Sequence, residues 1–348
     1  MRIQLASITV LLTLAQPLWA GQRVVGEERQ DVLTKILAQQ AHLEQVSASF
    51  DVTVEIDTAQ VQNLKPCWAA PILYRLTDST VRGAIDWHRD AASNKERVDI
   101  RFDVPPESAM DYFMDRILVD DGQRQVEGYL SSRQLLVTWS RPLATWPVPS
   151  DFLYPCGRAN LETVADDWSA IDVFRRDTGD FVIRFSPRSN PQTLIEAVVS
   201  PEWDYAITSW RAGQSARPAV RLDYVRDRSG TVVPLRARFE RTASPQSDLV
   251  VMRWTLEATR FDVGRPDDRV FRFPFVDGMV GADYSRSKSP TEPELFHTTA
   301  AGEFVAVPRT AMLNRPTRAA QTYANIGAAL VVLAFVGFRL NALVGRAA

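Results

Sequence analysis

Apolar and polar residues alternate along much of this chain, with the period of two that is typical of β-strands. In residues 49–57 every second side chain from Phe50 to Ile56 is apolar, and those between are acidic or threonine. Successive side chains of a strand point to opposite faces, so this segment predicts a strand with one buried and one solvated face. Residues 81–89 and 97–104 predict the next two strands.

The clearest fold signal is a run of three short strands within residues 116–139. Apolar residues 117–119 lead into an Asp-Asp-Gly turn, in which Gly122 can supply the positive φ of a tight hairpin. Residues 124–129 and 134–139 predict the second and third strands, with a Ser-Ser turn between them. Turns this tight connect only antiparallel strands, so the segment predicts a β-meander.

Other elements surround this meander. The spacing of apolar residues over Glu27–Val46 predicts an amphipathic helix. A second series of strands is predicted between residues 171 and 261, separated by turn signals, and residues 271–283 close the domain. The pattern favours a mainly β (α+β) fold, with a large antiparallel sheet of about eleven strands curled over a helix, in a domain at residues 21–284.

Both ends of the chain carry apolar segments. Residues 1–20 combine a basic start, an apolar run and a small-residue cleavage site, which predicts a signal peptide; an uncleaved N-terminal anchor is the alternative. Residues 319–340 predict a transmembrane helix. The most apolar part would span only about 24 Å, but flanking residues and a snorkelling Arg339 make up the difference. A soluble amphipathic helix is the alternative, although the run has no polar stripe.

The segments around this helix set the predicted topology. Residues 285–318 are rich in Ser, Pro and charged residues and predict a flexible linker, and residues 341–348 predict a short cytoplasmic tail. With the signal peptide at the other end, we expect the main domain on the outer side of a bacterial inner membrane, in the periplasm, held by a single-pass helix.

Composition narrows the class of protein. The chain has 348 residues, 45% of them hydrophobic, and can bury a sizeable core. Its formal net charge of −2 argues against a nucleic-acid partner. Two cysteines remain after the signal peptide, Cys67 and Cys156, and in an exported protein they predict a structural disulfide.

The sequence carries no recognisable catalytic or metal motif. Its three histidines, His42, His88 and His297, lie far apart and match no zinc-ligand spacing. A nucleophile elbow, a P-loop, an HExxH helix and a glycine-rich dinucleotide turn are all absent from the sequence. We therefore expect a protein that is not an enzyme, with no catalytic residue, metal ligand or cofactor.

Five stretches in the same order resemble the LolA type of periplasmic lipoprotein carriers and their relatives. They are "SASFDVTVEI" after the N-terminal helix, "VRGAIDWHR" followed by "RVDIRFDVPP", "ILVDDGQRQVEGY", "DFVIRFSPR" and "VFRFPFVDGMVGAD". The resemblance covers residues 27–285. It implies an open, incomplete antiparallel β-barrel in which helices cover a hydrophobic cavity for acyl chains.

The resemblance also implies site residues. An arginine on an early strand is functionally important in the carriers, and Arg89 matches it, although Asp90 stands where a proline usually follows. The expected lipid-binding face consists of Phe50, Ile85, Trp87, Arg89, Ile100, Phe102 and Trp254. Ordinary core packing is the alternative role for these aromatic residues.

Two functions remain open from the sequence. In the first, a membrane-anchored periplasmic protein binds a lipid or a lipoprotein acyl chain, as carrier, chaperone or envelope sensor. The membrane anchor argues against a carrier that diffuses between membranes. In the second, the domain is an envelope regulatory or scaffold module that binds a partner protein and no lipid.

Overall fold

The computed structural model describes residues 21–57, 80–103, 115–129, 132–138, 148–155, 161, 165, 167–188, 191–213, 219–242, 249–285, 293–299 and 302–307. The predicted signal peptide, Cys67, Cys156 and the predicted transmembrane helix and tail lie outside these residues. The chain divides into two units: unit 1 comprises residues 1–44, 50–63 and 147–263, and unit 2 comprises 45–49, 64–146 and 264–348.

The described part of unit 1 combines a long helix with antiparallel strands. Its elements are β1 (Gln22–Val24), α1 (Gly26–His42), the part of β2 (Gln45–Ile56) from Phe50 onward, α4 (Pro149–Leu153), η2 (Trp168–Ala170), β8 (Asp172–Arg175), β9 (Phe181–Phe185), β10 (Ile195–Ser200), η3 (Pro201–Trp203), β11 (Ala206–Ala212), β12 (Val220–Arg226), β13 (Val232–Thr242) and β14 (Val250–Val263). Strand β1 pairs with β8, and β8 to β14 then pair in chain order, every pair antiparallel. Strand β14 also pairs with β2.

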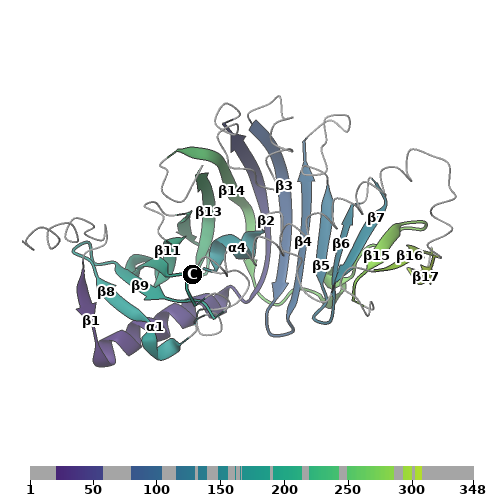
Figure 1. Cartoon of the computed structure of the whole chain (residues 1–348). Coiled ribbons are helices and arrows are strands. Elements are labelled where there is room, and N and C mark those ends of the chain that lie inside the picture. Colours follow the sequence, from purple (N-terminus) through teal and green to yellow (C-terminus); the bar gives the residue numbers. More distant parts are fainter. Residues whose placement is uncertain are drawn as a thin grey trace, which may run out of the picture. The chain divides into compact units, whose positions relative to one another are not determined.

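Helix α1 supplies the core of unit 1 together with the first strands of this sheet. Its Val32, Leu33 and Ile36 are buried against apolar side chains that include Ile183 and Ala197, and Figure 1 shows the helix running beside β8 and β9. Ile36 follows Val32 by four residues and Leu33 by three, so the three side chains share one helix face. The predicted helix is confirmed as an element and buries one apolar face.

The predicted end of this helix, at Val46, is wrong. The helix ends at His42, and the backbone N–H groups of Leu43 and Glu44 close a turn before β2 begins at Gln45. Val46 is buried as the first member of the period-two pattern of β2, so its apolar side chain serves the strand and not the helix.

The described residues of unit 2 lie almost entirely in strands and their turns. Its elements are the first part of β2 (to Ser49), β3 (Thr80–Asp90), β4 (Lys95–Phe102), β5 (Arg116–Asp120), β6 (Gln125–Tyr129), β7 (Gln134–Thr138), η4 (Asp268–Phe271), β15 (Val280–Asp283), β16 (Glu294–Thr298) and β17 (Phe304–Ala306). Strand β2 pairs with β3, and β3 to β7 then pair in antiparallel order, so the predicted meander is confirmed. Gly122 has φ +87° in the β5–β6 turn, as the sequence predicts.

Strands β15 to β17 extend unit 2 beyond the meander. Strand β15 lies parallel to β7, and β16 and β17 continue in antiparallel order. The parallel pairing is possible because a long stretch of chain separates β7 from β15. Phe296 of β16 forms a second core with one face of the meander, together with Phe273 and Met279 from the segment before β15. The Phe273 ring lies over Gly128, where a Cβ would be 2.1 Å from the Phe273 Cζ.

The mainly β class and the open antiparallel sheet are confirmed, and two details of the prediction are wrong. The described residues contain 17 strands and not about eleven, because three-residue strands such as β1 and β17 carry no readable alternation. Strands β16 and β17 lie within the predicted linker 285–318, and Phe296 and Thr298 are buried there. In the part of the chain that the structure describes, no helix is both long enough and apolar enough to cross a membrane.

Candidate functional site

One face of strands β3 to β7 in unit 2 brings together most of the predicted site residues. Side chains directly opposite each other on antiparallel strands share a face. The register therefore places Ile85 with Ile100 and Arg116, and Trp87 with Val98 and Leu118. We call this surface the mixed face; its members are Ile85, Trp87, Arg89, Glu96, Val98, Ile100, Phe102, Arg116, Leu118, Asp120, Gln125, Glu127, Tyr129, Gln134, Leu136 and Thr138.

Five of the seven predicted site residues lie on the mixed face. Ile85, Trp87 and Ile100 are completely or almost completely buried, with 0–1% of their surface exposed, and Arg89 and Phe102 are also buried. The period-two pattern of β3 and β4 explains their common orientation. The structure thus places Arg89 and the apolar residues Ile85, Trp87, Ile100 and Phe102 of the predicted lipid-binding face on adjacent strands of unit 2.

Phe50 and Trp254, the other two predicted residues, belong to unit 1. The Phe50 ring meets Phe261 edge-on, with centroids 6.3 Å apart. Trp254 lies opposite Phe239 in the β13–β14 register, and its Nε1 donates to Met252 Sδ at 3.0 Å. Both side chains are buried among neighbours of their own unit, an arrangement typical of core packing.

A row of polar residues crosses the mixed face near the strand ends. The register runs from Arg89 through Glu96, Asp120 and Gln125 to Thr138. These positions lie beside the β3–β4 and β5–β6 turns, whereas Phe102 lies at the opposite end of β4. The mixed face therefore has an apolar floor, formed by Ile85, Trp87 and Ile100, and a polar border, formed by this row. This arrangement suits an amphipathic ligand.

The floor and the border are joined by a buried hydrogen bond. Trp87 Nε1 donates to Glu96 Oε1 at 2.8 Å, and both residues are buried. A buried indole N–H usually finds such an acceptor, because an unbonded donor would lose its hydration without compensation. The bond fixes the orientation of both side chains at the boundary.

A second polar group lies deeper on the same face. Arg116 Nη1 donates to Glu127 Oε1 at 3.2 Å, and the Tyr129 hydroxyl donates to the same oxygen at 2.8 Å. The Arg116 guanidinium also stacks on the Tyr129 ring, 5.1 Å from its centroid. Charges removed from water in this way are stable only when paired and hydrogen-bonded. The mixed face thus has charged contacts inside as well as at its border.

The opposite face of β2 to β4 in unit 2 is polar and partly exposed. Ser49 donates to Asp86, which also pairs with Arg101, and Ser47 Oγ lies 2.9 Å from His88 Nδ1. These cross-strand contacts are typical of a solvated sheet face. The mixed face is therefore the buried side of these strands.

Asp90 anchors the turn end of β3. Its carboxylate accepts hydrogen bonds from Gln45 Nε2 at 3.1 Å and Ser93 Oγ at 2.9 Å, and lies 3.4 Å from Arg265 Nε. Burial raises its pKa, but these hydrogen bonds and the Arg265 charge outweigh burial and hold the pKa below its usual value. Asp90 stays ionised and holds the turn beside the polar row.

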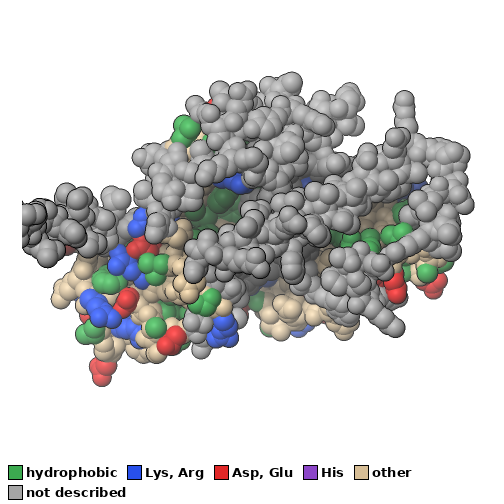
Figure 2. All heavy atoms as spheres, viewed as in Figure 1, with side chains coloured by type: hydrophobic (Ala, Val, Ile, Leu, Met, Phe, Trp, Pro, Cys, Tyr) green, Lys and Arg blue, Asp and Glu red, His purple; other side chains and the backbone are tan. Residues whose placement is uncertain are grey.

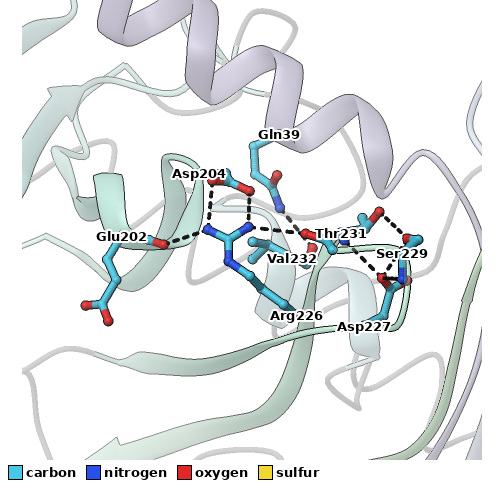
Figure 3. Close-up of polar contacts among 9 residues, drawn as sticks. Gln39, Glu202, Asp204, Arg226, Asp227, Ser229, Thr231 and Val232 are labelled. Carbon is cyan, nitrogen blue, oxygen red and sulfur yellow. Dashed lines mark hydrogen bonds and ion pairs between the residues drawn. The ribbon is translucent and has the colours of Figure 1, made fainter.

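Unit 1 has polar networks of a different kind. Figure 3 shows Arg226 hydrogen-bonded to both carboxylate oxygens of Asp204 and to the backbone oxygen of Glu202. Arg226 also donates to the backbone oxygen of Gly230. The Arg226 hydrogen bonds hold the Asp204 pKa below its usual value. Asp204 and Tyr205 have φ angles of +51° and +65°, and residues other than glycine rarely adopt a positive φ. The Arg226 hydrogen bonds therefore stabilise a strained turn.

The surface of unit 1 carries intermingled charges. Arg23 pairs with Asp172 at the surface, whereas Arg184 and Arg211, one from each neighbouring strand, both donate to the buried Glu196. Figure 2 shows positive and negative side chains close together over α1 and β8. Such paired charges explain sheet register and solubility better than ligand binding. Among the described residues, no group of three or more His, Cys, Asp or Glu could hold a metal ion.

Among the members of the mixed face that sequence reasoning missed are Glu96, Arg116, Gln125 and Glu127. All four are polar residues that are buried on it. The sequence did contain a signal for this face, because Arg116, Leu118 and Asp120 alternate with the apolar Ile117 and Val119. That alternation predicts which residues share a face, but polar residues in a strand normally indicate the solvated one.

No protein-family model matches this sequence, and no curated protein matches it. Among solved structures, the chain is similar to an uncharacterised conserved protein from Thermus thermophilus, at 10% identity over 71% of this chain and 95% of that one, with a TM-score of 0.28. A DUF1329 family protein from Desulfovibrio piger gives 13% identity over 70% and 96%, with a TM-score of 0.37. The complex of MucA and MucB from Pseudomonas aeruginosa gives 12% identity over 78% and 74%, with a TM-score of 0.26. Structural similarities this weak do not indicate a function for this chain.

Proposed function

We propose that this chain is a membrane-anchored protein of the bacterial envelope that binds a lipid or lipoprotein acyl chain on the mixed face of unit 2. The observation that supports it best is the apolar floor of Ile85, Trp87 and Ile100 bordered by the polar row from Arg89. Acyl chains gain free energy by leaving water for such a floor, at about 0.8 kcal/mol per CH₂ group. The polar row would meet the ester, amide or phosphate end of the ligand.

Arg89 is the residue in this proposal with the clearest chemistry. It stands opposite Glu96 in the β3–β4 register and ends the strand that carries Ile85 and Trp87. A guanidinium presents five donors in a planar fork and can bind a carbonyl or phosphate oxygen beside a carboxylate. We expect Arg89 to hold the polar end of the ligand at the border of the floor.

The test compares lipid retention in the full-length protein and two arginine variants. Mass spectrometry of a lipid extract should find acyl lipid with the wild type and less of it with Arg89→Leu. The lysine variant Arg89→Lys keeps the charge opposite Glu96 and loses the fork, so it should also retain less lipid. Arg101→Leu is the matched control, because Arg101 lies on β4 but points to the opposite, exposed face.

Equal lipid content in folded Arg89→Leu, Arg89→Lys and wild-type protein would remove Arg89 from the site. Absence of bound lipid from the wild type, together with a stable protein partner, would favour the alternative envelope scaffold. That alternative has one observation in its favour, because the protein's own residues bury Ile85, Trp87 and Ile100.

The proposed location has its own test. Protease added to the outside of spheroplasts should release a fragment that contains both units. Strand β17 extends to Ala306 and pairs with β16. We therefore expect cleavage after β17 and before the predicted helix at 319–340, in the last part of the predicted linker 285–318. A chain that resists protease until the cells are lysed would place the units in the cytoplasm.

A further inference from the structure

Gln125, at the start of β6, is a buried side chain whose amide makes no hydrogen bond to the described part of the chain. Only 2% of its surface is exposed, and neither Oε1 nor Nε2 has a hydrogen-bond partner among the described residues. The other buried glutamines of the described chain each use one end of the amide: Gln39 donates to the Val232 carbonyl, and Gln40 accepts from Leu161 N–H. An unbonded buried amide costs stability, so its presence calls for a role outside folding.

The surroundings of Gln125 point to a polar subsite on the mixed face. Asp120 and Thr138 lie directly opposite it on the neighbouring strands, and Glu127 lies two residues along β6 on the same face. Gln125 thus occupies the polar row that borders the apolar floor. A ligand whose acyl chain lies on the floor would bring its polar linkage to this row.

We propose that Gln125 recognises an amide linkage at the polar end of an acyl ligand. Its Nε2 would donate to the ligand carbonyl and its Oε1 would accept from the ligand N–H. A carboxamide satisfies both of its ends only with a group that presents one donor and one acceptor, which an amide does and an ester does not. A free carboxylate suits the position poorly, because Asp120 and Glu127 are acidic neighbours. The inference rests on the proposed acyl binding and adds the class of linkage.

The experiment measures how well two acyl probes displace the methyl ester of a fluorescent fatty acid from the full-length protein. N-methylpalmitamide and methyl palmitate have the same chain and differ only in the linkage. We expect the wild type to bind the amide about tenfold or more tightly, since the ester leaves the Gln125 acceptor without a donor. Gln125→Met, which keeps the shape and removes both polar atoms, should lose this preference.

Gln39→Met is the matched control. Gln39 is buried like Gln125, but it lies on α1 in unit 1 and not on the mixed face, and it donates to the Val232 carbonyl. This variant should keep the amide preference. The melting temperature gives a second readout, because removing an unbonded buried amide should leave the temperature for Gln125→Met unchanged or raise it.

Three results would overturn the inference. They are equal binding of the two probes by the wild type, an amide preference that survives in Gln125→Met, and unfolding of Gln125→Met, which would show that the amide is needed for the fold. If the wild type binds neither probe, the proposed acyl binding fails and this inference fails with it. Equal binding of both probes, by contrast, leaves the proposed function standing.

Discussion

Replacing Trp87 by alanine is expected to lower the free energy of unfolding by about 3–5 kcal/mol. The Trp87 side chain is completely buried on the mixed face, so its removal leaves a large cavity among Ile85, Val98 and their neighbours. The change also removes the indole donor that lies 2.8 Å from Glu96 Oε1. Chemical denaturation followed by circular dichroism would measure the loss.

Two further variants separate packing from hydrogen bonding at this position. Trp87→Phe keeps most of the buried surface and loses the hydrogen bond to Glu96, so it should cost less than the alanine change. His88→Ala is the matched control on the neighbouring residue, whose ring points to the opposite face and contacts Ser47. We expect that control to cost about 1 kcal/mol. A Trp87→Ala protein as stable as His88→Ala would contradict the buried position of Trp87.

Replacing Arg116 by methionine should also cost about 3–5 kcal/mol, for an electrostatic reason. The side chains of Arg116 and Glu127 are 2% and 11% exposed, and their atoms lie 3.2 Å apart. Without the guanidinium, Glu127 is a carboxylate in a buried site that keeps the Tyr129 hydroxyl as a donor. The remaining charge has lost its solvent and its counter-charge.

The double variant Arg116→Met/Glu127→Leu decides whether this cost belongs to the orphaned charge. Apolar replacement of both members of a buried ion pair is often neutral or stabilising, so the double variant should recover most of the lost stability. The exposed pair Arg101–Asp86 is the control, and Arg101→Met should change stability by at most about 1 kcal/mol. If Arg116→Met costs no more than Arg101→Met, the Arg116–Glu127 pair is not buried in solution.

The candidate site was predictable in its apolar part and not in its polar part. Ile85, Trp87, Arg89, Ile100 and Phe102 share the mixed face because the period of two along a strand already determines which residues point together. For polar residues the same period does not tell whether the face that they share is solvated or buried. A glutamine or glutamate is equally compatible with a solvated face and with a buried site, and only the neighbouring strands distinguish the two.

The sequence by itself determined the features that depend on neighbouring residues. These are the strands β2 to β7, the tight turn with Gly122 and the apolar face of α1, because backbone geometry and side-chain periodicity act over a few residues. The tertiary structure alone decided the parallel pairing of β15 with β7, the short strands β16 and β17 inside the expected linker, and the burial of Gln125. Each of these features depends on a segment distant in the chain that supplies hydrogen bonds or excludes water. The local pattern of apolar and polar residues does not indicate which distant segment this is.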